Sequence, residues 1–202
     1  MSNKQQILEA LRACPLPETE QVSAPLDALV FPDPVQQFRA TVEAVGGSTL
    51  QVSARDQIQA ALGSLAAFQN AKNVWSLVPE VASVGGDWDQ VEDPHALEVL
   101  DFCIVPGMLG VAENGAVWIT DRQIRHRAAL WIAQHVAIVL PANEIVQNMH
   151  EAYRRVDLAP LKFGVFISGP SKTADIEQSL VIGAHGPRSL TVVLVQPSGG
   201  TV

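Results

Sequence analysis

The stretch Ala128–Leu140, which reads AALWIAQHVAIVL, decides the class of fold. Only Gln134 and His135 interrupt its apolar run, which is too short to span a bilayer. A nearly continuous apolar run of this length is expected of a strand that is buried on both faces, as in a parallel sheet covered by helices. We therefore predict that this stretch contains a strand of an α/β protein that is buried on both faces.

The segments before this stretch alternate between two periodicities. Apolar residues at helical spacing predict helices over Val35–Val45 and Asp56–Phe68. Short apolar runs predict strands over Thr49–Val52 and Asn73–Val78. Because strand–helix–strand alternation implies parallel strands with right-handed crossovers, we predict an α/β fold of three layers, α/β/α, with a mainly parallel sheet.

The second half of the chain supplies further expected elements. A helix is predicted over Asn143–Val156, with Asn143 as its N-cap, and a strand over Leu190–Val195. The parallel sheet is expected to include Thr49–Val52, Asn73–Val78, Phe102–Val105 and Phe163–Ile167.

Composition excludes several classes of protein. The chain has 202 residues, of which 48% are hydrophobic, so it can bury a sizeable core. Its net charge of −8 argues against a nucleic-acid partner and against binding to an anionic membrane surface. The sequence from Met1 to Gln6 has no signal-peptide character, so we expect a cytoplasmic protein.

Cysteine content bears on redox cofactors. The chain has two cysteines, Cys14 and Cys103, and an ordinary [4Fe–4S] cluster requires four. No Gly-x-Gly-x-x-Gly sequence follows a predicted strand, as dinucleotide binding would require. The histidines lack a metal-ligand spacing. We therefore expect no flavin, haem, iron–sulfur cluster or metal.

The segment Ser168–Asp175 follows a predicted strand and reads SGPSKTAD. Such a turn directs backbone N–H groups and hydroxyls at one point, and a helix after it would add partial positive charge. With Lys172 supplying a full charge, the segment could hold an anion. Alternatively, Ser171 or Thr173 merely caps a helix, with Asp175 favouring its first turn.

Two basic segments are weaker candidates. His185 and Arg188 flank a Gly-Pro turn, where an arginine could bind a carboxylate or phosphate, although an ordinary surface turn is favoured. Arg122, Arg125 and Arg127 form a basic patch with His126, for which a solvated loop is favoured over an anion site.

Taken together, Ser168–Glu177 (SGPSKTADIE) and Val181–Arg188 (VIGAHGPR) closely resemble the signature of the lactate-utilisation protein C family, also called the LUD domain family. Gly110–Ala116 (GVAENGA) is similar to a second motif of that family, but Asn114 and Ala116 replace hydroxyl residues there. The resemblance is clear from Phe102 to Val195.

This resemblance implies the NagB/RpiA/CoA transferase-like fold. It also implies a role in oxidising L-lactate to pyruvate beside two partner proteins that carry the iron–sulfur chemistry. We accordingly divide the chain into residues 1–33, an N-terminal helix and linker arm; residues 34–196, the LUD domain; and residues 197–202, a flexible tail.

Glu113 is the candidate catalytic residue. The triplet Glu113–Gly115 resembles the Glu-Asn-Gly motif of class I CoA transferases, in which the glutamate forms an acyl thioester, and a carboxylate is a reasonable nucleophile. The motif is short, and no matching Gly-rich loop precedes it. A buried, hydrogen-bonded structural acid is favoured, a ligand or proton-transfer residue comes second, and the nucleophile comes third.

Three functions remain open from the sequence. The first is a non-redox accessory or ligand-binding subunit of a lactate-oxidation system, the second is an acyl-CoA transferase or other small-molecule enzyme using Glu113, and the third is a non-catalytic assembly protein. We expect one cleft to bind a small anion, either a hydroxy acid or a phosphate ester. Its expected residues are Glu113, Ser168, Gly169, Ser171, Lys172, Thr173, Asp175, His185 and Arg188.

Overall fold

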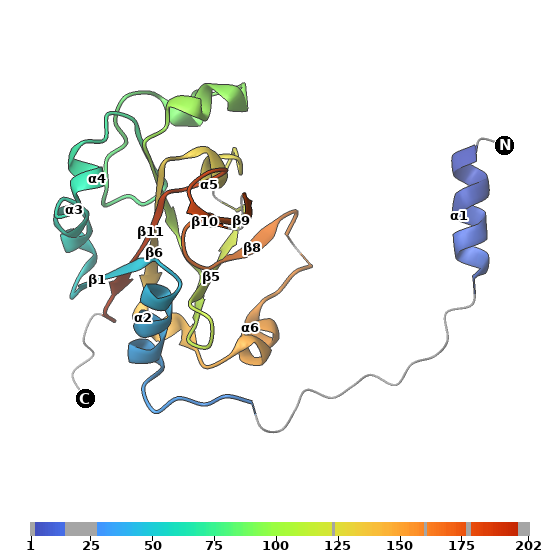
Figure 1. The fold of residues 1–202 in the computed structure, drawn as a ribbon, viewed down its shortest axis with the longest axis horizontal. Coiled ribbons are helices and arrows are strands. Elements are labelled where there is room, and N and C mark those ends of the chain that lie inside the picture. The colour runs from blue at the N-terminus through green and yellow to red at the C-terminus, as the bar shows by residue number, and fades with distance from the viewer. Residues whose placement is uncertain (1–2, 15–27, 123, 160, 177–178, 198–202) are drawn as a thin grey trace.

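Two main sheets form the centre of the molecule (Figure 1). The computed structural model describes residues 3–14, 28–122, 124–159, 161–176 and 179–197, but not the side chains of 174–176 and 179. The larger sheet has five parallel strands in the order β1-β11-β6-β3-β2. These strands are β1 (Ser48–Val52), β2 (Val74–Ser76), β3 (Phe102–Pro106), β6 (His135–Pro141) and β11 (Ser189–Val195).

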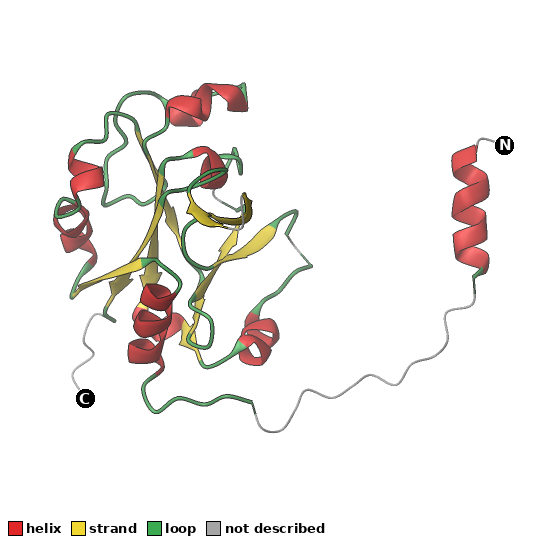
Figure 2. Cartoon of the chain, viewed as in Figure 1, coloured by secondary structure: helices red, strands yellow, loops and turns green. Residues whose placement is uncertain are grey.

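Burial explains why β6 and β11 occupy the middle of this sheet. Every residue from Val136 to Leu140 is buried, as is every residue from Leu190 to Val195, so both faces of these strands are covered. On one face, α2 (Pro34–Ala44) contributes Phe38 and Val42 to the core. The other face packs against α3 (Ile58–Leu62) and α4 (Ala66–Gln69), which Figure 2 shows as helices beside the sheet. The predicted parallel α/β sheet is confirmed.

The smaller main sheet has four strands in the order β7-β4-β5-β8. Its strands are β4 (Leu109–Val111), β5 (Ala116–Thr120), β7 (Ile145–Val146) and β8 (Gly164–Ile167). The expectation that Phe163–Ile167 belongs to the parallel sheet is wrong, because β8 pairs antiparallel with β5. Residues of β8 are exposed or half-buried, which suits an antiparallel strand with one face towards solvent.

Three predicted elements are broken into shorter pieces. Within Ala128–Leu140, the helical turn α5 (Ala129–Ile132) precedes β6. The predicted helix Asp56–Phe68 is η1 (Arg55–Gln57) followed by α3 and α4. The predicted helix Asn143–Val156 becomes η4 (Ala142–Glu144), β7 and α6 (Met149–Arg155), with Asn148 rather than Asn143 as the N-cap of α6. A cap has to accept a backbone N–H, and the Asn148 side chain accepts that of Glu151.

A two-stranded hairpin replaces the helix considered after Ser168–Ser171. Lys172–Ile176 is β9, and it pairs antiparallel with β10 (Ser179–Ile182). The anion site therefore cannot draw on the N-terminus of a helix there. The remaining elements are η2 (Trp88–Gln90), η3 (Pro94–Val99) and α1 (Asn3–Ala13), which has no buried residue. None of the described helices is both long and apolar enough to span a bilayer. Residues 198–202 of the expected tail lie outside the described residues.

Candidate functional site

The turn after β8 contacts the turn that holds Glu113. The Ser168 hydroxyl donates a hydrogen bond to the Asn114 carbonyl oxygen at 2.7 Å. Gly169, at φ +71°, follows, and a Cβ atom there would lie 2.6 Å from the Val45 carbonyl oxygen. This close approach to the end of α2 requires glycine. The structure thus brings together two segments that are 54 residues apart in the chain.

Glu113 is hydrogen-bonded but exposed. Its Oε2 atom accepts the Met149 backbone N–H at 2.9 Å, and its own N–H donates to the Gln147 carbonyl oxygen at 3.1 Å. The prediction of a hydrogen-bonded structural acid fits these contacts, whereas the expectation of burial is wrong. Because one carboxylate oxygen already holds the first residue of α6, the geometry favours a structural role over a nucleophilic one.

The loop before β11 is joined to Ser171. The Ser171 N–H donates to the Pro187 carbonyl oxygen at 3.0 Å, and the Ser171 carbonyl oxygen accepts the Gly183 N–H at 2.9 Å. Arg188 is anchored through its own N–H, which donates to the Gln134 carbonyl oxygen at 2.8 Å. The side chains of Lys172, His185 and Arg188 are exposed. Thr173 lies in β9 opposite Val181, and the side chain of Asp175 lies outside the described residues.

The predicted ligand-binding residues are split between two hollows near the amino ends of β6 and β11. Gly169 and Ser171 line a cavity of about 170 Å³ together with Trp131 and Leu190. Arg188 lines an open hollow of about 380 Å³ with Asp101 and His135, among others. Gly169, Ser171 and Arg188 therefore lie at the amino edge of the parallel sheet, although the carboxyl edge is where α/β proteins generally bind ligands.

His135 also lies at this edge, although the sequence predicted no site role for it. Its Nδ1 atom lies 2.8 Å from the Ser189 hydroxyl, and its ring stacks on Phe102 with 5.6 Å between centroids. Burial, and then the charge of Arg188, lower the pKa of His135, while Asp101 acts in the opposite direction. The contact with Ser189 spans 54 residues, so no local motif could have revealed it.

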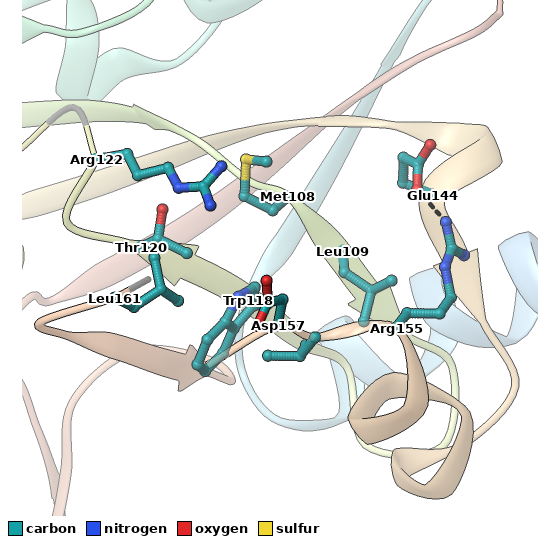
Figure 3. Close-up of a pocket in the computed structure, with 10 residues that line it drawn as sticks. Met108, Leu109, Trp118, Thr120, Arg122, Glu144, Arg155, Asp157 and Leu161 are labelled. Atoms are coloured by element: carbon teal, nitrogen blue, oxygen red, sulfur yellow. Dashed lines mark hydrogen bonds and ion pairs between the residues drawn. The ribbon is translucent and has the colours of Figure 1, made fainter. Parts of the chain in front are cut away.

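A third cavity lies past the carboxyl end of β3, on the smaller main sheet (Figure 3). It has a volume of about 210 Å³. Its lining residues are Met108, Leu109, Trp118, Thr120, Arg122, Glu144, Arg155, Val156, Asp157 and Leu161. From the sequence, Arg122 was predicted only to belong to a basic patch with Arg125, His126 and Arg127. Among the described residues, no group of three or more His, Cys, Asp or Glu side chains is arranged to hold a metal ion.

Comparisons with known proteins agree with this architecture. The LUD domain family model matches residues 87–195. Lactate utilization protein C of Shouchella clausii is 28% identical over 116 residues, which cover 54% of this chain and 51% of that protein. Lactate utilization protein C of Geobacillus kaustophilus is 33% identical over 92 residues, which cover 42% of this chain and 38% of that protein.

These matches span about half the length of the curated relatives, or less. The fold also matches the crystal structure of a DUF162 family protein from Deinococcus radiodurans with a TM-score of 0.60. That alignment covers 80% of this chain and 96% of the other, at 21% identity, and shows a common fold.

Proposed function

The chain belongs to the LUD domain family, and we propose that it is a non-redox, ligand-binding subunit of a system that oxidises L-lactate to pyruvate. The observation that carries the proposal is the similarity to lactate utilization protein C, together with a family match that contains the whole segment from Ser168 to Arg188. In this proposal, iron–sulfur partner proteins perform the electron transfer.

The chemistry of the chain supports this division of work. Cys103 is fully buried, and burial raises the pKa of its thiol to about 12, so the reactive thiolate is suppressed. The one other cysteine is Cys14. Two thiols, one of them inert, suit a subunit that binds a ligand and leaves electron transfer to others.

The proposed ligand is a small hydroxy acid such as L-lactate, held by the exposed cations of the signature. Lys172 directly follows Ser171, and Arg188 directly follows Pro187, so the Ser171–Pro187 hydrogen bond joins the two segments that carry these charges. A carboxylate can be bound by an ammonium and a guanidinium together. An acyl transfer by Glu113 is less favoured, because its carboxylate is engaged by Met149.

Calorimetric titration of the purified protein with L-lactate, pyruvate and ribose 5-phosphate tests the proposal. Binding of the hydroxy acid is expected, without formation of pyruvate by this chain alone. Lys172→Ala should weaken binding by about 1.5–3 kcal/mol, the range for a hydrogen bond to a charged group. Lys4→Ala, at an exposed lysine of α1, is the matched control and should have no effect. Lactate affinity that survives both Lys172→Ala and Arg188→Ala would contradict the assignment.

A further inference from the structure

The cavity of Figure 3 has an apolar floor. Trp118 and Leu109 come from neighbouring antiparallel strands, where they are directly paired, and both are buried. Leu161 closes the same cavity from the segment after α6. Met108, by contrast, is 48% exposed at the mouth. A hydrocarbon chain lying on this floor would be removed from water, which is the main source of affinity for a small apolar ligand.

One cation at this cavity has no counter-ion within the described part of the chain. Arg155 forms an ion pair with Glu144, which balances the charge of the Arg155 guanidinium. Neither a hydrogen bond nor an ion pair with any described residue engages the Arg122 guanidinium. Figure 3 shows that guanidinium directed towards Met108, across the cavity from the Glu144–Arg155 pair. Thr120 adds a hydroxyl nearby.

We propose that this cavity binds a short-chain monocarboxylate, with its carboxylate on Arg122 and its alkyl chain on Trp118 and Leu109. The site is separate from the signature segment, and it takes a more apolar acid than L-lactate. Arginine suits the role because its planar fork binds both oxygens of a carboxylate.

The volume of the cavity and the charges that line it restrict the length and the charge of the ligand. At about 30 Å³ for each water-sized group, a volume of 210 Å³ holds about seven non-hydrogen atoms, which corresponds to a carboxylate of four to six carbons. Glu144 and Asp157 also line the cavity, and the Asp157 carboxylate accepts the Ala159 N–H at 3.1 Å. Because Arg155 already balances the charge of Glu144, Asp157 is the acid that would repel a second negative charge, so a dicarboxylate of the same length should be rejected.

Calorimetric titration of the whole protein with propionate, butyrate, hexanoate, hexanoamide and adipate tests this proposal. Affinity is expected to rise about fourfold for each added methylene, as for burial of a CH₂ group, up to hexanoate. Hexanoamide and adipate should each bind at least about tenfold more weakly than hexanoate, because the first lacks the charge and the second carries one too many.

Variants locate the binding. Arg122→Gln should weaken hexanoate binding about tenfold or more, whereas Arg154→Gln, an exposed arginine of α6 that does not line the cavity, should leave it unchanged. Met108→Trp should fill the mouth and block hexanoate without lowering the melting temperature, since Met108 is half-exposed. Equal affinity for hexanoate and hexanoamide would overturn the proposal. So would hexanoate binding that survives both Arg122→Gln and Met108→Trp, or that is abolished by Lys172→Ala.

Discussion

Gly164 lies against the ring of Trp118, so its lack of a side chain has a structural reason. A Cβ atom at Gly164 would lie 2.2 Å from the Trp118 Cη2 atom, well inside van der Waals contact. The ring cannot retreat easily, because it also contacts the tilted ring of Phe166, with 4.6 Å between centroids. Gly164→Ala should therefore lower the free energy of unfolding by about 1–3 kcal/mol, the usual cost of overpacking.

Urea denaturation monitored by circular dichroism checks this expectation. The matched control is Gly63→Ala, because Gly63 has helical dihedral angles of φ −60° and ψ −16°, which alanine adopts without strain. The control should be neutral or slightly stabilising. If Gly164→Ala were as stable as the wild type, Trp118 would have room that the structure does not show.

His135 should make stability depend on pH. Its pKa is lowered in the folded state from the ordinary 6.5, so the unfolded chain binds a proton more readily. The free energy of unfolding should therefore fall as the pH drops below about 6.5 and continue to fall until the folded-state pKa is reached. His135→Gln keeps a polar partner for Ser189 but has no proton to bind, so its stability should fall less over this range.

Comparing the wild type with His135→Gln isolates the contribution of His135 to the pH dependence of stability. His95 acts in the opposite direction, because its hydrogen bond with Asp93 raises its pKa, but it is present in both proteins. Thermal melts between pH 7.5 and pH 5 give the difference. Parallel pH profiles for the wild type and His135→Gln would mean that burial and Arg188 do not shift this imidazole.

At the level of elements, Asn148 ties α6 to a distant segment. It is buried, accepts the Glu151 N–H at 3.0 Å and donates its Nδ2 hydrogen to the Leu29 carbonyl oxygen at 2.8 Å. Asn148→Ala loses both bonds and should cost about 2 kcal/mol, at the upper end for an N-cap. Asp33→Ala removes the exposed cap of α2 and should cost less.

Asn148→Ser separates the two functions of this side chain. It keeps a neutral acceptor for the cap but loses the amide that donates to Leu29, so its stability should lie between those of the wild type and Asn148→Ala. Chemical denaturation of the three proteins provides the ranking. If Asn148→Ser matched Asn148→Ala, the cap would contribute little.

An element could be predicted from the sequence where its own residues show that it is buried or where it ends. β6 and β11 are nearly continuous apolar runs, and α2 with its C-cap Val45 is followed by Gly46, whose φ of +82° favours glycine. β9 could not be predicted, because Ser171 and Thr173 are also typical helix caps and the competing hairpin depends on pairing with β10. Asn143 and Asn148 are equally plausible caps by type, and the bond to Leu29 that distinguishes them spans 119 residues.

Among the candidate sites, too, those carried by a local motif could be predicted and those formed by distant segments could not. The signature motif predicted that Ser168 and the turn at Glu113 belong to one region, and their hydrogen bond is consistent with this. The His135–Ser189 contact and the cavity at Arg122 arise only when separate strands are placed side by side. Such sites have no local spacing that a single sequence could show.

At the scale of the whole molecule, the N-terminal region has two parts with different attachments. α1 buries no residue, so removing it should cost the domain little. Residues 29–31, in contrast, are bonded to the strand–helix junction before α6. Phe31 donates its N–H to the Gln147 Oε1 atom at 2.7 Å, and Leu29 accepts from Asn148. The stable unit should therefore begin before residue 34, near residue 28.

Two truncations test where that unit begins. Deleting residues 1–27 should change the melting temperature by less than about 2 °C, the shift expected from surface changes of up to 0.5 kcal/mol in a chain of this length. Deleting residues 1–33 also removes the bonds to Gln147 and Asn148, leaving Asn148 buried without its acceptor, and should lower the melting temperature by several degrees. A large drop for the shorter deletion, at all protein concentrations, would mean that α1 packs on its own domain. A drop that disappears on dilution, where wild type and variant melt alike, would mean instead that α1 packs on a second copy of the chain.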